Sequence, residues 1–353
     1  MRIVYNSFHG RYSDSPRALY EQLLERPGIE HVWLADPAHR EAFPKDAVTV
    51  DIDGPDARAT LESSDLVIAS SHTELDWDKP EGTTYLQTWH GTPLKRIHYD
   101  VLWAPEGRLD ELDRDVARWD LLLSPNAVST PRLRKAFAYD GEVLESGYPR
   151  NDLLSSPLMH EVRARVRKEL GISEGTTTVL YAPTWRDQEV LMDTTKDVPF
   201  ALDPEAFVSA LGPDQVLLAR AHNFATGRSR LAQLPGVHDV SYFPDVRDLY
   251  AAADVLVTDY SSVMFDFAIT GKPIVFYAYD LDRFRDSIRG FYFDLLSDAP
   301  GPVVQTQEEL FSTLARMPEL TGDYAGRYAE FQETFNHLED GRAGDRVLAR
   351  LGL

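Results

Sequence analysis

The stretch Asp254–Phe267, DVLVTDYSSVMFDF, carries the strongest fold signal in this chain. It opens with a short apolar run, which is typical of a buried strand. Apolar residues at helical intervals follow without a break, which predicts a helix. Ser261 and Ser262 fall in the first turn of that predicted helix. A buried strand that leads directly into a helix is the repeating unit of parallel α/β sheets, whose two faces are both covered.

The same alternation extends over the rest of the sequence. In the second half, the other predicted strands are TTVLYAPTW, QVLLARAH and PIVFYAY, and helices are predicted near 203–211, 245–253 and 261–270. In the first half, strands are predicted in RIVYNSF and near 31–35, 47–52, 65–70, 84–89, 121–125 and 143–147, with helices from Pro16, at 110–119 and at 128–139. This order predicts two parallel sheets, each with helices on both faces.

The strand–helix pattern pauses at Asn151–Pro157, and a charged helix, HEVRARVRKELG, follows the pause. We therefore predict an N-terminal domain at 1–152 and a C-terminal domain at 153–320, with the helices of about 321–353 crossing back to the first domain. The predicted fold class is α/β, with two Rossmann-like, doubly wound parallel-sheet domains that face a central cleft. Ligands bind such folds at the carboxyl ends of the strands.

Composition limits the classes of function. The chain has 353 residues, no cysteine and a net charge of −21. The acidic balance argues against a nucleic-acid partner, and the absence of cysteine excludes disulfides and thiolate metal sites. No apolar stretch approaches the roughly 20 residues of a membrane span, so the cytoplasm is the expected compartment. If the substrate is a polyanion, basic residues must be concentrated where it binds.

The segment QTWHGTPLKR predicts a catalytic histidine at the end of a strand. His90 lies just past the predicted strand, Gly91 permits a tight bend, and Thr92 and Lys95 follow. An imidazole titrates near neutral pH, so it can take a proton from a hydroxyl nucleophile without a metal. The alternative is a structural histidine that caps a helix or hydrogen-bonds to a backbone carbonyl.

Candidate phosphate contacts follow the strands of the second half. Ser261 and Ser262 precede the helix whose unpaired N–H groups could bind a pyrophosphate, although an ordinary N-cap serine explains most such junctions. Arg186, Arg220 and His222 follow two neighbouring strands and would supply positive charge at the same sheet edge. Their alternative is solvent-exposed loop charge.

Two further loops of the first half hold candidate contacts. Arg150, in GYPRND, either reaches the ligand or belongs to a rigid turn between the domains. His9 and Arg11, in SFHGRYSDSP, are candidate acceptor contacts in the loop after the first strand. No P-loop, HExxH, EF-hand or GxSxG motif occurs, and no pair of aspartates suggests a metal site, so we expect transfer without a metal or other cofactor.

Taken together, seven motifs resemble the CDP-glycerol glycerophosphotransferase family, which contains the teichoic acid primases and polymerases. The motifs are WHGTPLKR, GYPRND, YAPTWR, RAH, VTDYSSVMFDFA, RGFYFD and DGRAGDRV. The resemblance covers nearly the whole chain. It implies a GT-B fold, with the CDP-activated donor in the C-terminal domain and the acceptor in the N-terminal domain.

The resemblance also implies roles for single residues. The catalytic residues would be His90 and His222. His90 would activate the acceptor hydroxyl, and His222, with Arg220, would hold or neutralise the donor phosphates. Donor contacts would come from Pro183, Thr184, Arg186, Arg220, Asp259, Ser261 and Ser262. Acceptor or phosphate contacts would come from Gly91, Thr92, Lys95, His9, Arg11 and Arg150. The family commonly has a glycine where this chain has His98.

The implied reaction moves glycerol phosphate from CDP-glycerol to a hydroxyl of a polyol-phosphate or glycan acceptor and releases CMP, as in the synthesis of teichoic acid or capsule-like polymers. The family's usual acceptor is lipid-linked, which implies peripheral contact with the inner membrane surface. Candidate basic patches are Arg132, Arg134 and Lys135 on one helix and Arg163–Lys168 on another, unless these are solvated helix faces. A CDP-ribitol donor, a nucleotide-sugar donor and a noncatalytic binding module stay open as alternatives.

Overall fold

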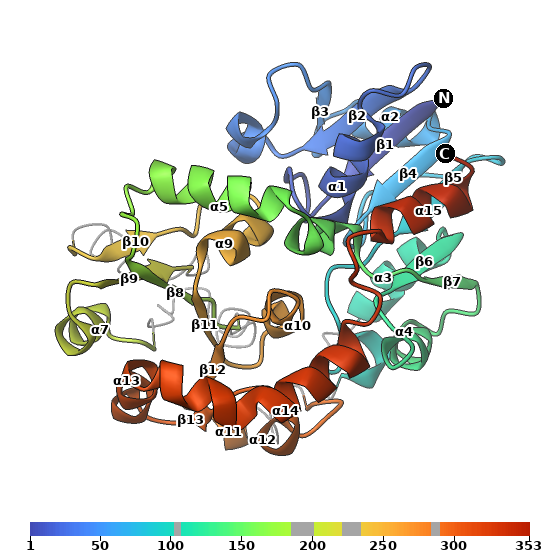
Figure 1. Ribbon diagram of the computed structural model, residues 1–353. Coiled ribbons are helices and arrows are strands. Elements are labelled where there is room, and N and C mark those ends of the chain that lie inside the picture. Colours follow the sequence, from blue (N-terminus) through green and yellow to red (C-terminus); the bar gives the residue numbers. More distant parts are fainter. Residues whose placement is uncertain (102–106, 185–200, 221–233, 284–289) are drawn as a thin grey trace. The chain divides into compact units, whose positions relative to one another are not determined.

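The computed structural model describes residues 1–101, 107–184, 201–220, 234–283 and 290–353. The chain divides into two compact units (Figure 1). Unit 1 consists of Met1–Pro93, Ile97–Ser156 and His337–Leu353, and unit 2 consists of Leu94–Arg96 and Pro157–Asn336. Each unit is built on one parallel sheet, so the predicted α/β class with two Rossmann-like domains is confirmed.

Unit 1 contains a seven-stranded sheet in the order β3-β2-β1-β4-β5-β6-β7. All neighbouring strands are parallel. The strands are β1 (Arg2–Asn6), β2 (Glu30–Ala35), β3 (Thr49–Asp51), β4 (Leu66–Ala69), β5 (Thr84–Gln87), β6 (Leu121–Ser124) and β7 (Glu142–Glu145). The order reverses at β1, so the loops after β1 and β4 lie at the point where α/β sheets of this kind place their ligands.

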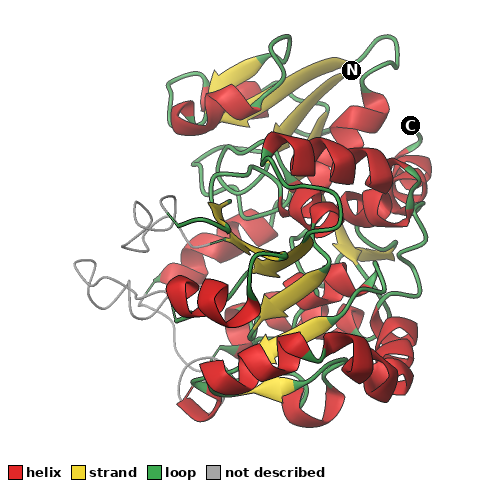
Figure 2. Ribbon diagram, turned by 60° about the vertical axis from the view of Figure 1, so that its left-hand side comes forward, coloured by secondary structure: helices red, strands yellow, loops and turns green. Residues whose placement is uncertain are grey.

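Helices cover both faces of this sheet (Figure 2). Side chains along a strand alternate between the faces, so Ile3 and Tyr5 enter one buried cluster and Val4 enters the other. The helices of unit 1 are α1 (Asp14–Leu23), α2 (Ala57–Glu62), α3 (Arg108–Val116), α4 (Ser129–Phe137) and α15 (Ala343–Leu351), with 3-10 turns at Pro37–Ala42, His98–Asp100 and Pro149–Ser155. Buried apolar residues on both faces explain why the strands read as continuous apolar runs.

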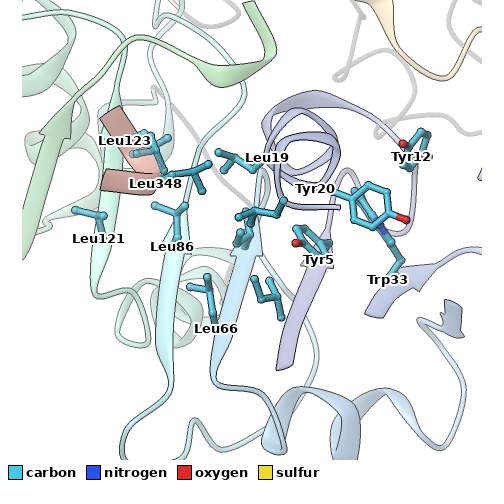
Figure 3. Close-up of a cluster of buried hydrophobic side chains, with 14 of the residues drawn as sticks. Tyr5, Tyr12, Leu19, Tyr20, Trp33, Leu66, Leu86, Leu121, Leu123 and Leu348 are labelled. Atoms are coloured by element: carbon cyan, nitrogen blue, oxygen red, sulfur yellow. The ribbon is translucent and has the colours of Figure 1, made fainter. Parts of the chain in front are cut away.

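The first cluster is rich in aromatic rings, as Figure 3 shows. The rings of Tyr5 and Trp33 stack at 4.9 Å, and Tyr20 packs edge-on against Tyr5 at 5.4 Å. Val347 and Leu348 of α15 complete the same cluster although they lie almost at the end of the chain. The C-terminal segment is therefore part of the core of unit 1.

Unit 2 contains a six-stranded parallel sheet in the order β10-β9-β8-β11-β12-β13. Its strands are β8 (Thr177–Tyr181), β9 (Gln215–Ala219), β10 (Val237–Asp239), β11 (Val255–Thr258), β12 (Ile274–Tyr277) and β13 (Val303–Val304). Its helices are α5 (Leu158–Glu169), α7 (Pro204–Leu211), α9 (Val246–Ala252), α10 (Val263–Ala268), α11 (Leu281–Arg283), α12 (Leu295–Asp298), α13 (Gln307–Ala315) and α14 (Met317–Phe335). The stretch Asp254–Phe267 forms β11 and most of α10, and β11 lies beside β8 near the middle of the sheet.

The structure differs from the sequence-based prediction mainly at the chain end and at short strands. The predicted helix that follows about residue 321 begins at Met317 and lies in unit 2, whereas His337–Leu353 belongs to unit 1. The edge strands β10 and β13 were not predicted. They have three and two residues, which is too short to show an alternating pattern.

Candidate active site

A strained turn after β5 presents His90. Trp89 has a φ of 53°, in the left-handed region, and its N–H donates to Oε1 of Gln87 at 2.9 Å. Bulky residues rarely adopt this conformation, because it costs on the order of 1–3 kcal/mol. It persists only where the surrounding structure imposes it. His90 follows this turn, beyond the carboxyl end of β5, and its side chain is half-buried.

The hydrogen bond of His90 determines its tautomer. Nδ1 of His90 lies 2.6 Å from the carbonyl oxygen of Ser70, which follows β4. A carbonyl oxygen can only accept, so Nδ1 carries the proton and the neutral ring keeps its lone pair on Nε2. The ring also packs on Trp89 at 4.1 Å and on Phe8 at 5.1 Å. A bond from His90 to a backbone carbonyl was expected for a purely structural histidine. The same bond would also fix the orientation of the ring if His90 acts as a base.

Gly91 and Thr92, which follow the histidine, are buried in unit 1. The hydroxyl of Tyr148 donates to the carbonyl of Gly91 at 3.3 Å, and Thr92 is 3% exposed. Their predicted role as acceptor or phosphate contacts stays a prediction.

The loop after β1 lies next to His90 through the Phe8 ring. Phe8, His9 and Gly10 all have positive φ, and a Cβ atom on Gly10 would lie 2.2 Å from the backbone nitrogen of Asp36. Only glycine fits that contact. Nε2 of His9 pairs with Asp53 at 3.3 Å, and burial lowers the pKa of Arg11 against the opposing effect of Asp36. Both candidate acceptor contacts are thus in a loop that contacts His90 through the Phe8 ring.

Arg150 has a structural role in unit 1. Its guanidinium is 4% exposed, pairs with Asp14 at 3.0 Å, and lies over the ring of Tyr148 at 4.6 Å. Its backbone N–H donates to Oγ of Ser15 at 3.4 Å. This buried pair holds the start of α1 against the Pro149–Ser155 turn, and a contact of Arg150 with substrate stays a prediction.

In unit 2, a buried aspartate organises the turn between β11 and α10. Asp259 is fully buried, and its Oδ1 accepts hydrogen bonds from the N–H groups of Thr184 at 2.7 Å and of Tyr260 at 2.5 Å. Thr184 follows β8, so Asp259 joins the ends of two neighbouring strands. The role of Asp259 in orienting this turn for a donor phosphate stays a prediction.

The two serines precede a short helix. Ser261 and Ser262 are partly exposed, and α10 begins only at Val263 and has six residues. Among the described residues neither serine hydroxyl makes a hydrogen bond. A helix this short has little dipole, so the hydroxyl groups and the turn's N–H groups would be the main attraction for a phosphate.

The other predicted donor contacts are placed unevenly. Pro183 and Thr184 lie two and three residues past the end of β8. Nη1 of Arg220 donates to the carbonyls of Val240 and Phe243 at 3.2 and 3.0 Å. Arg186 and His222 lie outside the described residues.

Lys95 belongs to unit 2 although His90, five positions earlier in the sequence, belongs to unit 1. Lys95 forms an antiparallel bridge with Phe291, flanked by hydrogen bonds from Arg96 N to Gly290 O at 3.2 Å and from Tyr292 N to Leu94 O at 2.8 Å. In this pattern the side chains of Lys95 and Phe291 share one face. Phe291 packs on Tyr260 at 5.3 Å, so the partner of Lys95 contacts the residue that precedes Ser261.

The two basic helices mostly use their cations within the fold. On α4, Arg132 donates to Pro93 O at 3.2 Å, Arg134 donates to Tyr139 O at 3.3 Å, and Lys135 pairs with Asp100 at 2.6 Å. On α5, Arg163 and Arg167 pair with Asp254 at 2.6 and 3.3 Å, and Arg165 pairs with Asp248 at 2.9 Å. The prediction of a basic surface patch on either helix is therefore unsupported.

The described ranges contain neither a candidate metal cluster nor a candidate membrane span. No three histidine, aspartate or glutamate side chains in that part of the chain converge on a position that could hold a metal ion. None of its helices combines the length and the apolar character needed to cross a bilayer.

Two Rossmann-like sheets, each with polar side chains at the carboxyl ends of its strands, define the GT-B class of α/β enzymes. Within that class, the sequence profile of the CDP-glycerol:poly(glycerophosphate) glycerophosphotransferase family matches residues 1–352. The chain belongs to this family. The resemblance seen in the sequence and the predicted enzyme class, a glycerophosphotransferase, are thereby confirmed.

Individual relatives agree with the family assignment. The teichoic acid glycerol-phosphate transferase of Staphylococcus aureus is 38% identical over 98% of this chain and 91% of that protein. A teichoic acid poly(glycerol phosphate) polymerase of Bacillus subtilis is 33% identical over 98% of this chain, which corresponds to 48% of the polymerase. A solved structure of the wall teichoic acid polymerase TagF matches with a TM-score of 0.90 at 32% identity, over 99% of this chain and 88% of that chain.

Proposed function

We propose that this chain transfers glycerol phosphate from CDP-glycerol to a hydroxyl of a polyol-phosphate acceptor and releases CMP. The observation that carries the proposal is the hydrogen bond from Nδ1 of His90 to Ser70 O, because it leaves Nε2 as the nitrogen that can accept a proton. The description of the family supports CDP-glycerol as the donor, and the names of the relatives support teichoic acid as the polymer class.

In the proposed reaction, the acceptor oxygen attacks the β-phosphorus of CDP-glycerol. A bond forms between that oxygen and the phosphorus, and the bond from the phosphorus to the bridging oxygen of CMP breaks. Nε2 of His90 takes the hydroxyl proton as the new bond forms. Positioned donors that stabilise the developing charge usually contribute the largest part of such catalysis.

Unit 2 would supply those donors. Asp259 holds the turn that carries Ser261 and Ser262, and Lys95 is paired with Phe291, whose ring packs on Tyr260 of the same turn. We assign Lys95 to the donor phosphates on this ground. Arg186, Arg220 and His222 complete the proposed donor set, and His9 and Arg11 the proposed acceptor set.

The proposed acceptor is the growing end of a lipid-linked polymer at the cytoplasmic face of the membrane. The reason is chemical, since a polyol phosphate offers the terminal hydroxyl that the base must deprotonate. Parallel assays with a soluble acceptor and with the same acceptor on lipid vesicles test this part separately from the transfer itself.

The decisive experiment measures CMP release from CDP-glycerol by the wild-type protein and by His90→Ala. Loss of a general base typically lowers the rate about 10²- to 10⁴-fold, and we expect a drop in that range with unchanged donor affinity. His160→Ala removes an exposed imidazole from α5 and is the matched control, with wild-type turnover expected.

The same assay includes CDP-ribitol and a UDP-sugar as rival donors. Faster CMP release from CDP-ribitol, or release of UDP alone, would replace the proposed donor. Near-normal turnover of His90→Ala would remove His90 from the mechanism, and the absence of product with every donor would favour a binding module.

A further inference from the structure

Gln87, the last residue of β5, connects the two loops that hold His90. Its side chain is fully buried, and both ends of its amide bind backbone. Oε1 accepts from the N–H of Trp89 at 2.9 Å, and Nε2 donates to the carbonyl of Ser71 at 3.1 Å. The first bond holds the turn that precedes His90, and the second holds the loop that supplies its hydrogen-bond acceptor.

The carbonyl that orients His90 lies between two such attachments. Ala69 O accepts from the N–H and the hydroxyl of Thr88 at 2.8 and 3.2 Å, and Ser71 O accepts from Gln87. Ser70, the residue between them, accepts from Nδ1 of His90 at 2.6 Å. Without the bond at Ser71, the loop would be tied to the β5 turn on one side of Ser70 only.

We propose that Gln87 is a positioning residue for the transfer reaction, which sets the tautomer and the direction of His90 by clamping the Ser70–Ser71 loop to the Trp89–His90 turn. This inference rests on the proposed role of His90 as the base. The physical reason is that the hydrogen bond made by one ring nitrogen of a histidine determines whether the other nitrogen can accept a proton. A residue that fixes the position of Ser70 O therefore also fixes the tautomer of His90.

Only an amide can make both bonds. A carboxylate of the same shape can still accept from Trp89, but it has no hydrogen for Ser71 O and would repel that carbonyl. A thioether side chain of similar length offers neither a strong donor nor a strong acceptor. Trp89 depends on the clamp most, because its φ of 53° needs support from its surroundings.

The first test reads the tautomer directly, with no substrate present. Nitrogen NMR of protein with labelled histidine distinguishes the two neutral tautomers, and the His90→Gln variant identifies the His90 signals. We expect the Nδ1–H form in the wild type and a mixture of the two tautomers in Gln87→Glu. Gln87→Met, which carries no buried charge, is expected to show the same change and serves if Gln87→Glu does not fold.

The second test measures turnover with CDP-glycerol. Misplacement of a catalytic group by about 1 Å can cost about 100-fold, so we expect kcat to fall by roughly tenfold to 100-fold in either variant. The KM for the donor should not change, because the donor set lies in unit 2. The pH profile of kcat should shift as well, since the base has lost its fixed partner.

The matched control is Thr83→Val, at the residue that precedes the first residue of β5. Thr83 is buried and its hydroxyl donates to Ser64 O at 2.6 Å, so this change also removes a buried hydrogen bond to a carbonyl. We expect lower stability but a wild-type tautomer, kcat and pH profile. An equal fall of kcat in Thr83→Val would reduce Gln87 to a stabilising residue.

An unchanged His90 tautomer in both Gln87 variants would overturn the inference. This outcome differs from a failure of the proposed function. If His90→Ala retains normal turnover, the base is another group, whereas the NMR comparison still decides whether Gln87 controls the ring.

Discussion

His98 has a backbone conformation that residues other than glycine rarely adopt. It has a φ of 47°, in the left-handed region where the family commonly has glycine, and its side chain is only 2% exposed. Its Nε2 lies 3.5 Å from Asp113, and its ring lies 5.8 Å from that of His72, which faces Asp115 at 3.4 Å. Burial lowers the pKa of His98, His72 lowers it further, and Asp113 opposes both effects.

This lowered pKa predicts a loss of stability in mild acid. Below the ordinary value of 6.5, the unfolded chain binds a proton at His98 while the folded protein stays neutral there, so stability falls as the pH drops. The loss ends at the lower pH where the folded form is itself protonated. One such group contributes at most about 1.4 kcal/mol per pH unit.

His98→Asn tests this linkage, because asparagine tolerates the left-handed backbone and does not titrate. Urea unfolding at about pH 7.5 and about pH 5.5 gives the free energy of unfolding for both proteins. We expect a smaller decrease on acidification in the variant. Equal decreases in the two proteins would show that His98 does not contribute to the acid dependence.

Two cations bind the carbonyl groups at the end of helix α9. They are Lys272, in the loop before β12, and Arg163 of α5. Lys272 donates to the carbonyls of Tyr250, Ala251 and Ala253 at 3.0, 3.1 and 2.6 Å. Arg163 of α5 donates to Ala252 O at 2.9 Å and pairs with Asp254. The last carbonyls of a helix have no partner within it and carry partial negative charge, so these cations close the helix end.

Lys272→Met would remove three of these donors while keeping an apolar stem of similar length. Buried acceptors that lose their donor cost about 1–3 kcal/mol, and we expect destabilisation of that size. Lys168→Met, on the exposed side of α5, is the control with little expected effect. Thermal or urea unfolding measures both, and a Lys272→Met variant as stable as the control would contradict this account.

The last residues of the chain return to complete unit 1. Glu339 accepts from the N–H of Tyr148 at 3.1 Å, and Asp152 accepts from the N–H groups of Ala343 and Gly344 at 2.9 and 2.7 Å. A Cβ atom on Gly147 would lie 2.7 Å from Leu338 O, so the glycine permits this approach. Two of the family motifs, GYPRND and DGRAGDRV, therefore serve at least in part to close the fold.

Leu348→Ala should weaken unit 1 as a whole. The side chain is 4% exposed within the core cluster, and such truncations cost about 2–5 kcal/mol. Of the six tryptophans, Trp185 alone falls in the residue range of unit 2, so in a Trp185→Phe background tryptophan fluorescence during urea unfolding reports on unit 1. We expect a lower midpoint for Leu348→Ala.

Leu314→Ala makes the same change in the core of unit 2, where the side chain is 5% exposed. It should leave the tryptophan transition nearly unchanged. A wild-type midpoint for Leu348→Ala would mean that the C-terminal segment contributes little to the stability of unit 1.

The sequence by itself determined the two parallel sheets, the position of His90 at a strand end and the turn that contains Asp259. These features depend on neighbours in the chain, because strand and helix periodicity and turn chemistry are local. The family followed from the same local motifs. Short edge strands such as β13, with two residues, leave no local pattern and were missed.

The tertiary structure alone decided which motif residues meet. It buried Arg150 against Asp14, 136 positions away, and placed Lys95 beside Phe291 in unit 2. It also gave Gln87 its two backbone partners and His90 its tautomer. Such pairings depend on how distant loops meet at a sheet edge. A buried polar group needs a hydrogen-bond partner, and that partner lies in another part of the chain, so no single stretch of sequence specifies the pair.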